Sequence, residues 1–207
     1  RIPPVKIVFS EEDRKEILNR LDNSLAIGYV AMGKNVREFE EKFSNYTASK
    51  YAIAVSSGSS AIEIAMRILN VKDKEVLVPT NTFLATAGGV HLAGGQVRLV
   101  DIEPKTFSVS LNELKRRVTN NTVGVIVVHI GGIITPEIEK IQVWCQENDL
   151  WLIEDAAHAH GSKWNNKMAG GFGLAGTYSF FATKVMTSGE GGMIITEDEN
   201  FAKNVLL

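Results

Sequence analysis

The chain has 207 residues, with 22 Lys and Arg against 24 Asp and Glu, which gives a formal net charge of −2. This balance argues against a basic nucleic-acid-binding domain, and a hydrophobic fraction of 44% argues against a disordered chain. No apolar run approaches the roughly 20 residues that cross a bilayer, and no signal-peptide pattern opens the sequence. We therefore expect a cytoplasmic protein with no nucleic-acid and no membrane partner. Cys145 is the single cysteine, so neither an intrachain disulfide nor a thiolate-rich metal site is expected.

Residues 1–50 are predicted to form an N-terminal helical segment. Ser10 and Asp13 match a capping box at the start of a first helix. After a loop with Gly28 and Gly33, apolar side chains recur at three- and four-residue steps, which predicts a second helix with one face in the core. These side chains are Val36, Phe39, Phe43 and Tyr46.

From residue 51 onward, short apolar runs alternate with helical patterns. Seven runs are strand-like: 51–55, 75–78, 96–100, 123–128, 151–153, 177–181 and 193–196. Helical patterns lie between the first five runs, at 60–69, 85–92, 112–118 and 136–148. Continuous apolar strands that alternate with helices predict an α/β fold in three αβα layers, with a parallel sheet covered on both faces. The pattern contains no linker, so residues 51–207 are expected to be one domain.

Ligands of open α/β sheets bind at the carboxyl ends of the strands, so the residues that follow each strand are the first candidates for a site. The first predicted strand is followed by the serine-rich segment 56–60, which runs into a helix. Gly58 lets the backbone approach a ligand, and the helix N-terminus together with the Ser59 hydroxyl would bind an anion such as phosphate. Serines also cap helices without any ligand, so a plain N-cap is the alternative.

Phe83 and Asp155 follow two further strands. Phe83 could place a flat ring at the mouth of the sheet, although by itself a core phenylalanine is the simpler interpretation. Asp155 ends a buried apolar strand and therefore needs a cationic or hydrogen-bonding partner. His158 and His160 lie nearby, but the histidine spacing does not match a zinc site, and we expect no metal.

Ser179 and Lys184 follow the sixth predicted strand, just before a glycine-rich turn. Burial at this position would lower the pKa of the Lys184 amine, as a Schiff-base lysine requires. A solvated surface lysine is the alternative. The segment 171–176, Gly-Phe-Gly-Leu-Ala-Gly, matches the dinucleotide-binding glycine pattern, but it precedes a strand instead of a helix, so NAD binding is not predicted.

Together these signals indicate a planar, phosphorylated cofactor with a cationic ring nitrogen and a lysine-reactive aldehyde, namely pyridoxal 5′-phosphate. The chain resembles the N-terminal half of the DegT/StrS family of pyridoxal-phosphate-dependent sugar aminotransferases, of fold type I. The resemblance is carried by Phe39-Glu40, Ser57-Gly58-Ser59, Pro79 to Phe83, Asp101, His129, Glu154 to His158, Ser179 to Lys184 and Gly189 to Gly192.

The resemblance implies a role for each candidate. Lys184 would hold the cofactor as a Schiff base and move the proton, and Asp155 would pair with the ring nitrogen. Gly58, Ser59 and Ser179 would bind the phosphate. Phe83 would stack on one face of the ring and His158 would lie against the other. Residues 51–207 would be the pyridoxal-phosphate-binding large domain, with seven mostly parallel strands and one antiparallel strand.

The resemblance implies that the protein transfers an amino group from an amino acid to a nucleotide-linked keto sugar. Glutamate is the expected amino-acid donor. A lyase or dehydratase with the same cofactor is one alternative, although some relatives with that chemistry replace the lysine with histidine. A non-catalytic relative is another. The family's enzymes complete each site across a homodimer. Because members are nearly twice as long, the large domain is expected to be incomplete at its C-terminus and the small C-terminal domain to be absent.

Overall fold

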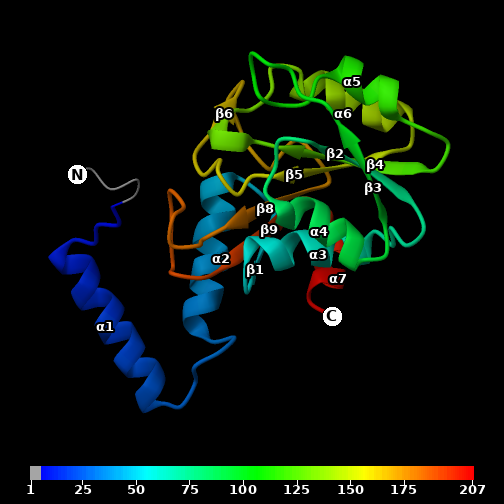
Figure 1. Ribbon diagram of the computed structural model, residues 1–207. Coiled ribbons are helices and arrows are strands. Elements are labelled where there is room, and N and C mark those ends of the chain that lie inside the picture. Colours follow the sequence, from blue (N-terminus) through cyan, green and yellow to red (C-terminus); the bar gives the residue numbers. More distant parts are fainter. Residues whose placement is uncertain (1–5) are drawn as a thin grey trace.

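The computed structural model describes residues 6–207, so the start of the chain at Arg1 lies outside the described part. A seven-stranded sheet forms the centre of the molecule (Figure 1). Its strands lie in the order β1 (Tyr51–Val55), β9 (Gly192–Thr196), β8 (Ala175–Ser179), β5 (Trp151–Asp155), β4 (Thr122–Val128), β2 (Glu75–Pro79) and β3 (Gln96–Val100). The strands predicted from residue 51 onward are all present and share this sheet.

Strand direction decides which ends of the strands meet. β9 runs antiparallel to its two neighbours, β1 and β8, and every other pairing in the sheet is parallel. The carboxyl ends of β1, β2, β4, β5 and β8 therefore lie at one edge, where Gly192 at the start of β9 pairs with both Val55 and Ser179. The mostly parallel sheet with one antiparallel strand is thus confirmed.

Helices cover both faces of the sheet, which confirms the three-layer arrangement (Figure 1). One face carries α3 (Gly58–Ile68), α4 (Leu84–Leu92) and α7 (Glu199–Val205), and the other carries α2 (Lys34–Thr47), α5 (Leu111–Arg117) and α6 (Ile138–Glu147). Successive strand side chains alternate between the two buried cores. On β5, Ile153 packs in the core with α3 and α4, whereas Leu152 packs in the core with α2 and α6.

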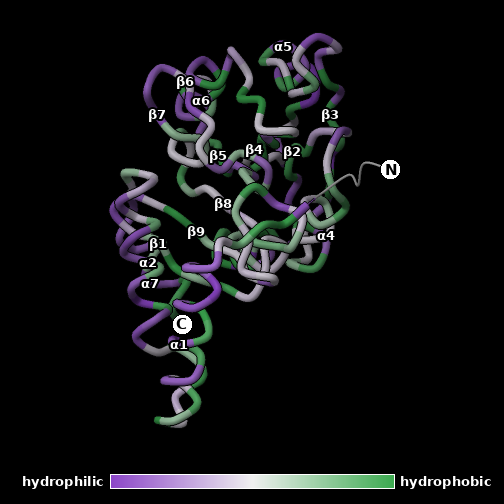
Figure 2. The backbone as a smooth tube through the Cα atoms, turned by 90° about the vertical axis from the view of Figure 1, so that its left-hand side faces the viewer, coloured by the Kyte–Doolittle hydropathy of each residue, from purple (hydrophilic) through white to green (hydrophobic). Residues whose placement is uncertain are grey.

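The N-terminal helix α1 (Glu11–Ala26) stands away from this body and buries none of its residues (Figures 1 and 2). The predicted capping box is present, since the Ser10 hydroxyl and the Asp13 carboxylate accept hydrogen bonds from each other's backbone amides. An ion pair of 2.7 Å between Arg20 and Glu38 links α1 to α2. Helix α2, in contrast, packs against the body through the predicted apolar stripe, in which Phe43 is fully buried.

Two details differ from the expectation. A short hairpin of β6 (Lys163–Trp164) and β7 (Lys167–Met168) is not among the predicted elements, although its Asn165-Asn166 turn has the positive φ values that asparagine tolerates in tight hairpins. The strand predicted at 177–181 lies at Ala175–Ser179, because its ladder with β9 already begins at Ala175. No helix within residues 6–207 is long and apolar enough to cross a membrane.

Candidate active site

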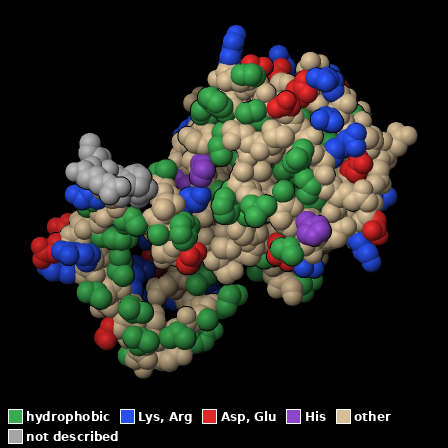
Figure 3. Space-filling view, viewed as in Figure 1, with side chains coloured by type: hydrophobic (Ala, Val, Ile, Leu, Met, Phe, Trp, Pro, Cys, Tyr) green, Lys and Arg blue, Asp and Glu red, His purple; other side chains and the backbone are tan. Residues whose placement is uncertain are grey.

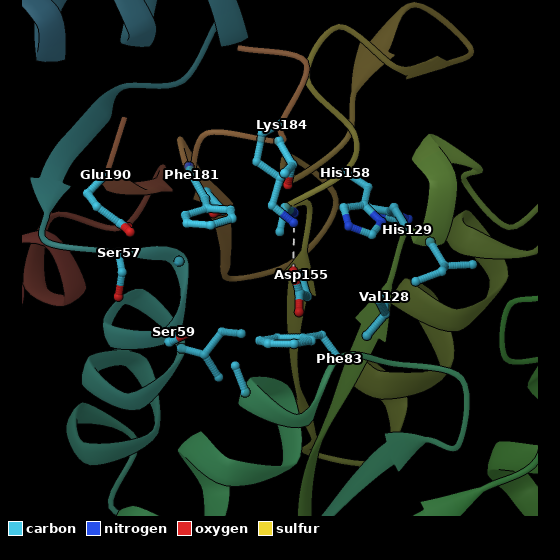
Figure 4. Close-up of a pocket in the computed structure, with 17 residues that line it drawn as sticks. Ser57, Ser59, Phe83, Val128, His129, Asp155, His158, Phe181, Lys184 and Glu190 are labelled. Carbon is cyan, nitrogen blue, oxygen red and sulfur yellow. Dashed lines mark hydrogen bonds between the residues drawn. The ribbon is translucent and has the colours of Figure 1, made fainter. Parts of the chain in front are cut away.

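A cavity of about 410 Å³ opens at the carboxyl edge of the sheet (Figure 4). It is lined by every residue that the sequence singles out: Gly58, Ser59, Phe83, Asp155, His158, Ser179 and Lys184. These residues come from the four segments at the carboxyl ends of β1, β2, β5 and β8, and parallel strand order brings them together. Figure 4 shows Lys184 and His158 above Asp155, and Phe83 below it.

The N-terminus of α3 forms one side of the cavity. Ser57 is the N-cap residue: its hydroxyl accepts a hydrogen bond from the Ser60 amide at 3.1 Å, and the Ser60 hydroxyl accepts one from the Ser57 amide at 2.9 Å. The capping interpretation is therefore correct for this pair. The next two amides, of Gly58 and Ser59, have no acceptor among the described residues, so they and the positive end of the helix dipole are available to an anion.

Gly58 is required by a close approach between α3 and the end of β8. A Cβ atom built on Gly58 would lie 2.7 Å from the Cβ of Ser179, which is too close for any side chain. Gly192 is equally confined, because a Cβ there would overlap the backbone of Ser57. Two glycines thus allow two free amides and the Ser179 hydroxyl to share a small cradle, which a larger residue would fill.

Asp155 is the last residue of β5, and its carboxylate is buried at the base of the cavity. Its Oδ2 atom accepts a hydrogen bond of 2.7 Å from the Thr86 hydroxyl, and its Oδ1 atom accepts one of 3.1 Å from the Ala157 amide. Thr86 lies in α4, is fully buried and also bonds Thr82 at 2.6 Å. Asp155 therefore has the donors its burial requires. Thr86 is a site residue that sequence reasoning missed, although its position one turn after Phe83 was an available signal.

Lys184 lies on the turn after β8 and is half-buried. Its amine makes no ion pair or hydrogen bond with any side chain in residues 6–207, and Asp155 is the carboxylate whose charge acts on it. Burial lowers the pKa of this amine, as expected from the sequence, while the charge of Asp155 partly opposes that shift. A lysine with a lowered pKa and no partner is available as a nucleophile.

Phe83 and His158 approach the cavity from different elements. Phe83 is the N-cap residue of α4 and is 71% exposed, so the expectation of a core phenylalanine is wrong. The chain turns into α4 at this point, which directs the ring into the cavity. His158 follows β5, and its Nδ1 atom accepts a hydrogen bond of 3.3 Å from the Gly131 amide. Burial and the charge of Lys184 lower the pKa of His158.

Two further cavity residues have no role in the sequence interpretation. Glu190, from the turn before β9, and Phe181, just after β8, both line the cavity. The motif that contains Glu190 was visible in the sequence, but no single residue in it indicated that the carboxylate would face the site. Residues 6–207 contain no cluster of three His, Cys, Asp or Glu side chains that could hold a metal ion.

The glycine pattern at 171–176 has a different function from dinucleotide binding. The amides of Gly170, Phe172 and Gly173 donate hydrogen bonds to the Glu154 carboxylate, and β8 begins within the pattern at Ala175. The glycine-rich turn therefore binds a carboxylate of the same chain, a contact that the sequence interpretation did not predict.

The chemistry of the cavity fits pyridoxal phosphate. The free amides and hydroxyls at the α3 N-terminus suit a phosphate, the Asp155 carboxylate suits a protonated ring nitrogen, and the Lys184 amine suits an aldehyde. The model of the DegT/DnrJ/EryC1/StrS aminotransferase family matches residues 11–207. The chain belongs to this family.

Relatives and solved structures in the family have the same fold. The chain is 34% identical to a GDP-perosamine synthase of Escherichia coli O157:H7 over 89% of its own length and 50% of that protein. It superposes with a TM-score of 0.89 and 30% identity on DesI, solved with its TDP-sugar product, covering 94% of this chain and 49% of DesI. A GDP-4-keto-6-deoxymannose-3-dehydratase, solved with a trapped adduct of pyridoxal phosphate and glutamate, gives a TM-score of 0.91 at 31% identity, covering 100% of this chain and 54% of the dehydratase.

These matches establish the fold type I large domain and pyridoxal phosphate as the cofactor of the DegT/DnrJ/EryC1/StrS family. The chain spans about half the length of the curated relatives it matches. The role of each residue remains a prediction from the sequence. The geometry shows that these residues line one cavity.

Proposed function

We propose that the protein is an aminotransferase that moves an amino group from glutamate to a nucleotide-linked keto sugar. The observation that carries this proposal is the half-buried Lys184 amine, which has no partner in residues 6–207 and faces a cavity that also contains Asp155 and the free amides of α3. Pyridoxal phosphate, when bound, supplies the electron sink that stabilises negative charge on the substrate carbon.

The phosphate side is assigned to α3 and β8. The amides of Gly58 and Ser59 would donate to phosphate oxygens, and the hydroxyls of Ser59 and Ser179 would add two further donors. The α3 N-terminus and Ser179 both have a rigid backbone, because Ser57 caps the helix and the β8–β9 ladder holds Ser179. This cradle would fix one end of the cofactor.

The ring side is assigned to Asp155, Phe83 and His158. Asp155 would accept a hydrogen bond from the ring nitrogen, with Thr86 and the Ala157 amide holding its two oxygens in place. The exposed ring of Phe83 would cover one face, and His158, oriented by the Gly131 amide, would lie against the other. Both side chains would exclude water from the ring.

Lys184 would carry the proton in the reaction. Burial lowers the pKa of its Nζ atom, which favours the unprotonated amine that acts as nucleophile and then as general base and acid. Residues 51–207 would be the domain that holds the cofactor, and residues 1–50 a helical segment that precedes it. The cytoplasm would be the compartment, and a homodimer the assembled state.

A sugar acceptor is favoured by the similar proteins, and the arginines of the chain do not oppose it. Glutamate and a keto acid both need a carboxylate clamp, for which a bidentate arginine is the usual group. No arginine lines the cavity in the described residues, and those near the sheet pair with carboxylates elsewhere: Arg67 with Glu63, Arg98 with Glu75 and Arg116 with Glu113. The names of the GDP-perosamine synthase and of DesI with its TDP-sugar product point to the same class.

A dehydratase is the second candidate, since one of the similar structures carries that name. Lys184 occupies the position of the cofactor lysine, which favours transamination. The resemblance associates dehydratase chemistry with a histidine at that position. Both reactions would use the same phosphate and ring contacts. Product analysis separates them, since a dehydratase releases a deoxygenated keto sugar and an aminotransferase releases an amino sugar.

Two measurements on the intact protein test the proposal. Borohydride reduction after incubation with pyridoxal phosphate, followed by peptide mapping, should place the pyridoxyl group on Lys184, and an adduct confined to another lysine would refute the assignment. Incubation with glutamate and either nucleotide-linked keto sugars or plain keto acids should give product with the sugars. Turnover of keto acids alone would overturn the sugar assignment.

A further inference from the structure

Glu154 is a buried carboxylate that the cofactor assignment leaves without a function. It immediately precedes Asp155 on β5, so the two side chains point to opposite faces of the sheet. Asp155 lies on the α4 side with Thr86, whereas Glu154 lies on the side of Leu152, beneath α2 and α6. Glu154 has no exposed surface. A carboxylate so placed is costly unless donors surround it.

Four donors surround Glu154. Its Oε2 atom lies 2.8 Å from His129 Nε2 and 2.7 Å from the Gly170 amide. Its Oε1 atom accepts hydrogen bonds from the amides of Phe172 at 2.5 Å and Gly173 at 2.7 Å. The side chain thus links β4 on one flank of β5 to the entry of β8 on the other.

His129 connects Glu154 to residues that line the cavity. The ring is fully buried, its Nε2 atom donates to Glu154, and its Nδ1 atom has no partner in the described residues. The His129 backbone amide donates to the Asp155 carbonyl at 3.0 Å. The 3₁₀ turn η1 (Ile130–Gly132) follows directly, and its Gly131 amide is the group that holds His158.

The other flank leads to Ser179. The turn bound by Glu154 enters β8, and Tyr178, next to Ser179, donates from its hydroxyl to the carbonyl of Ala169 at the start of that turn. The position of Ser179 therefore depends on the same turn that Glu154 fixes. One buried carboxylate is connected to both the ring side and the phosphate side of the cavity.

We infer that Glu154 and His129 are positioning residues, which hold His158 and the ends of β5 and β8 in the geometry that the cofactor needs. This inference rests on the proposed function for its purpose, but its geometry is independent of the cofactor. If the contact from Glu154 through His129 and η1 to His158 is rigid, breaking it at His129 must release the hydrogen bond that the Gly131 amide donates to His158 Nδ1.

The decisive test is the titration of His158 by NMR in protein without cofactor. A donor on Nδ1 favours the neutral ring, so its loss raises the pKa of His158. Lys184, Asp155 and His160 are the charged or titratable groups around that ring, and none of them is changed. His129→Leu should raise the pKa of His158 by about half a unit or more, roughly a threefold change in proton affinity. His129→Gln, which can still donate to Glu154, should restore most of the original value.

Controls separate positioning from loss of stability. Thr122→Val removes the acceptor of a 3.0 Å hydrogen bond from the Thr119 amide at the start of β4, at the end of the strands opposite the cavity, so it should lower the melting temperature without moving the His158 titration. Should His129→Leu fail to fold, Glu154→Gln provides a milder break, because its amide group cannot accept from all four donors. An unchanged His158 titration in whichever variant folds overturns the inference.

The same proteins distinguish the inference from the proposed function. With pyridoxal phosphate added, the original chain should develop the visible absorbance of a lysine-bound cofactor, and His129→Leu should bind it at least about tenfold more weakly, whereas His129→Gln and Thr122→Val should not. Absence of that absorbance in the original chain would overturn the proposed function, while the His158 titration would still decide the inference. Equal cofactor affinity in all variants would overturn the positioning role.

Discussion

At the scale of single residues, Asp155 is held by two donors that leave its carboxylate directed toward the cavity. The Thr86 hydroxyl and the Ala157 amide occupy one oxygen each. Neither donor is cationic, so the negative charge of Asp155 remains available to a ring nitrogen. This arrangement explains why a carboxylate is tolerated at the end of a buried strand.

Asp155→Asn should lower turnover at least about a hundredfold, because the neutral amide cannot stabilise a positive ring nitrogen. Cofactor binding should weaken much less, since the phosphate cradle at Gly58 and Ser179 is unchanged. Steady-state rates and an absorbance titration with pyridoxal phosphate measure the two effects. Thr86→Val, which removes only the supporting hydrogen bond, should have a smaller effect on turnover, and activity of Asp155→Asn near the original value would refute the role.

His160 is a buried histidine with neither ring nitrogen bonded in the described residues. It packs against the rings of Tyr178 and Phe180, on the side of the sheet away from Asp155. Burial, aided by the positive charge of Lys184, lowers the pKa of His160 to about 4. The neutral ring is therefore the form compatible with the folded state.

Acid should destabilise the fold through His160. Between pH 6.5 and about 4 the unfolded chain binds a proton that the folded chain does not, so the free energy of unfolding falls as the pH is lowered through that window. The contribution is fully present above about pH 6.5, and its loss amounts to at most about 3 kcal/mol. Urea unfolding at pH 7 and pH 5 should show a smaller pH dependence for His160→Phe than for the original chain. His91→Gln, at an exposed site, is the control, and an equal pH dependence in all three proteins would contradict the prediction.

At the scale of elements, α3 and β8 meet so closely that one glycine decides their spacing. The Gly58 position leaves no space for a methyl group beside Ser179, whereas a methyl group at Gly88 in α4 would have no atom within 4 Å. The two glycines lie in neighbouring helices on the same face of the sheet. They form a matched pair for mutation.

Gly58→Ala should separate α3 from β8, weaken pyridoxal phosphate binding at least about tenfold and destabilise the fold by about 1–3 kcal/mol through overpacking. Gly88→Ala should leave binding unchanged and stabilise the protein by about 0.5–1 kcal/mol, because alanine favours a helix. Thermal unfolding and an absorbance titration measure both. Normal cofactor affinity in Gly58→Ala would show that the close approach is not needed for the phosphate.

At the scale of the whole molecule, α1 forms an arm with exposed apolar side chains. Leu18, Leu21 and Leu25 are each more than half exposed, and the loop after the helix adds Ile27 and Val30. Figure 3 shows hydrophobic side chains along this arm and a hollow between the arm and the body. Apolar surface of this kind is typical of a protein interface.

We expect the intact protein to be a homodimer in solution, with the α1 arm contributing to the interface. Substituting Leu21→Gln and Leu25→Gln together should shift the equilibrium toward monomer, as measured by light scattering across a concentration series. Val143→Gln, at an exposed apolar site on α6, is the control and should leave the mass unchanged. A monomer for the unsubstituted protein at assay concentration would contradict the expectation.

The sequence by itself determined the seven strands of the main sheet, their helical connections and part of the cavity lining. Apolar periodicity is a local property, and a parallel sheet necessarily brings the residues after its strands to one edge, so Gly58, Asp155 and Lys184 could be placed together without knowing any contact. The resemblance added their roles.

Only the tertiary structure decided which partners these residues have. The Thr86–Asp155 hydrogen bond joins residues 69 positions apart, and His129 reaches Glu154 across 25. Such contacts depend on strand order, register and the face to which each side chain points, none of which a local pattern encodes. The same holds for α1, where Leu18, Leu21 and Leu25 recur at helical spacing whether or not another element covers them, because such spacing gives the faces of a helix and not what lies against them.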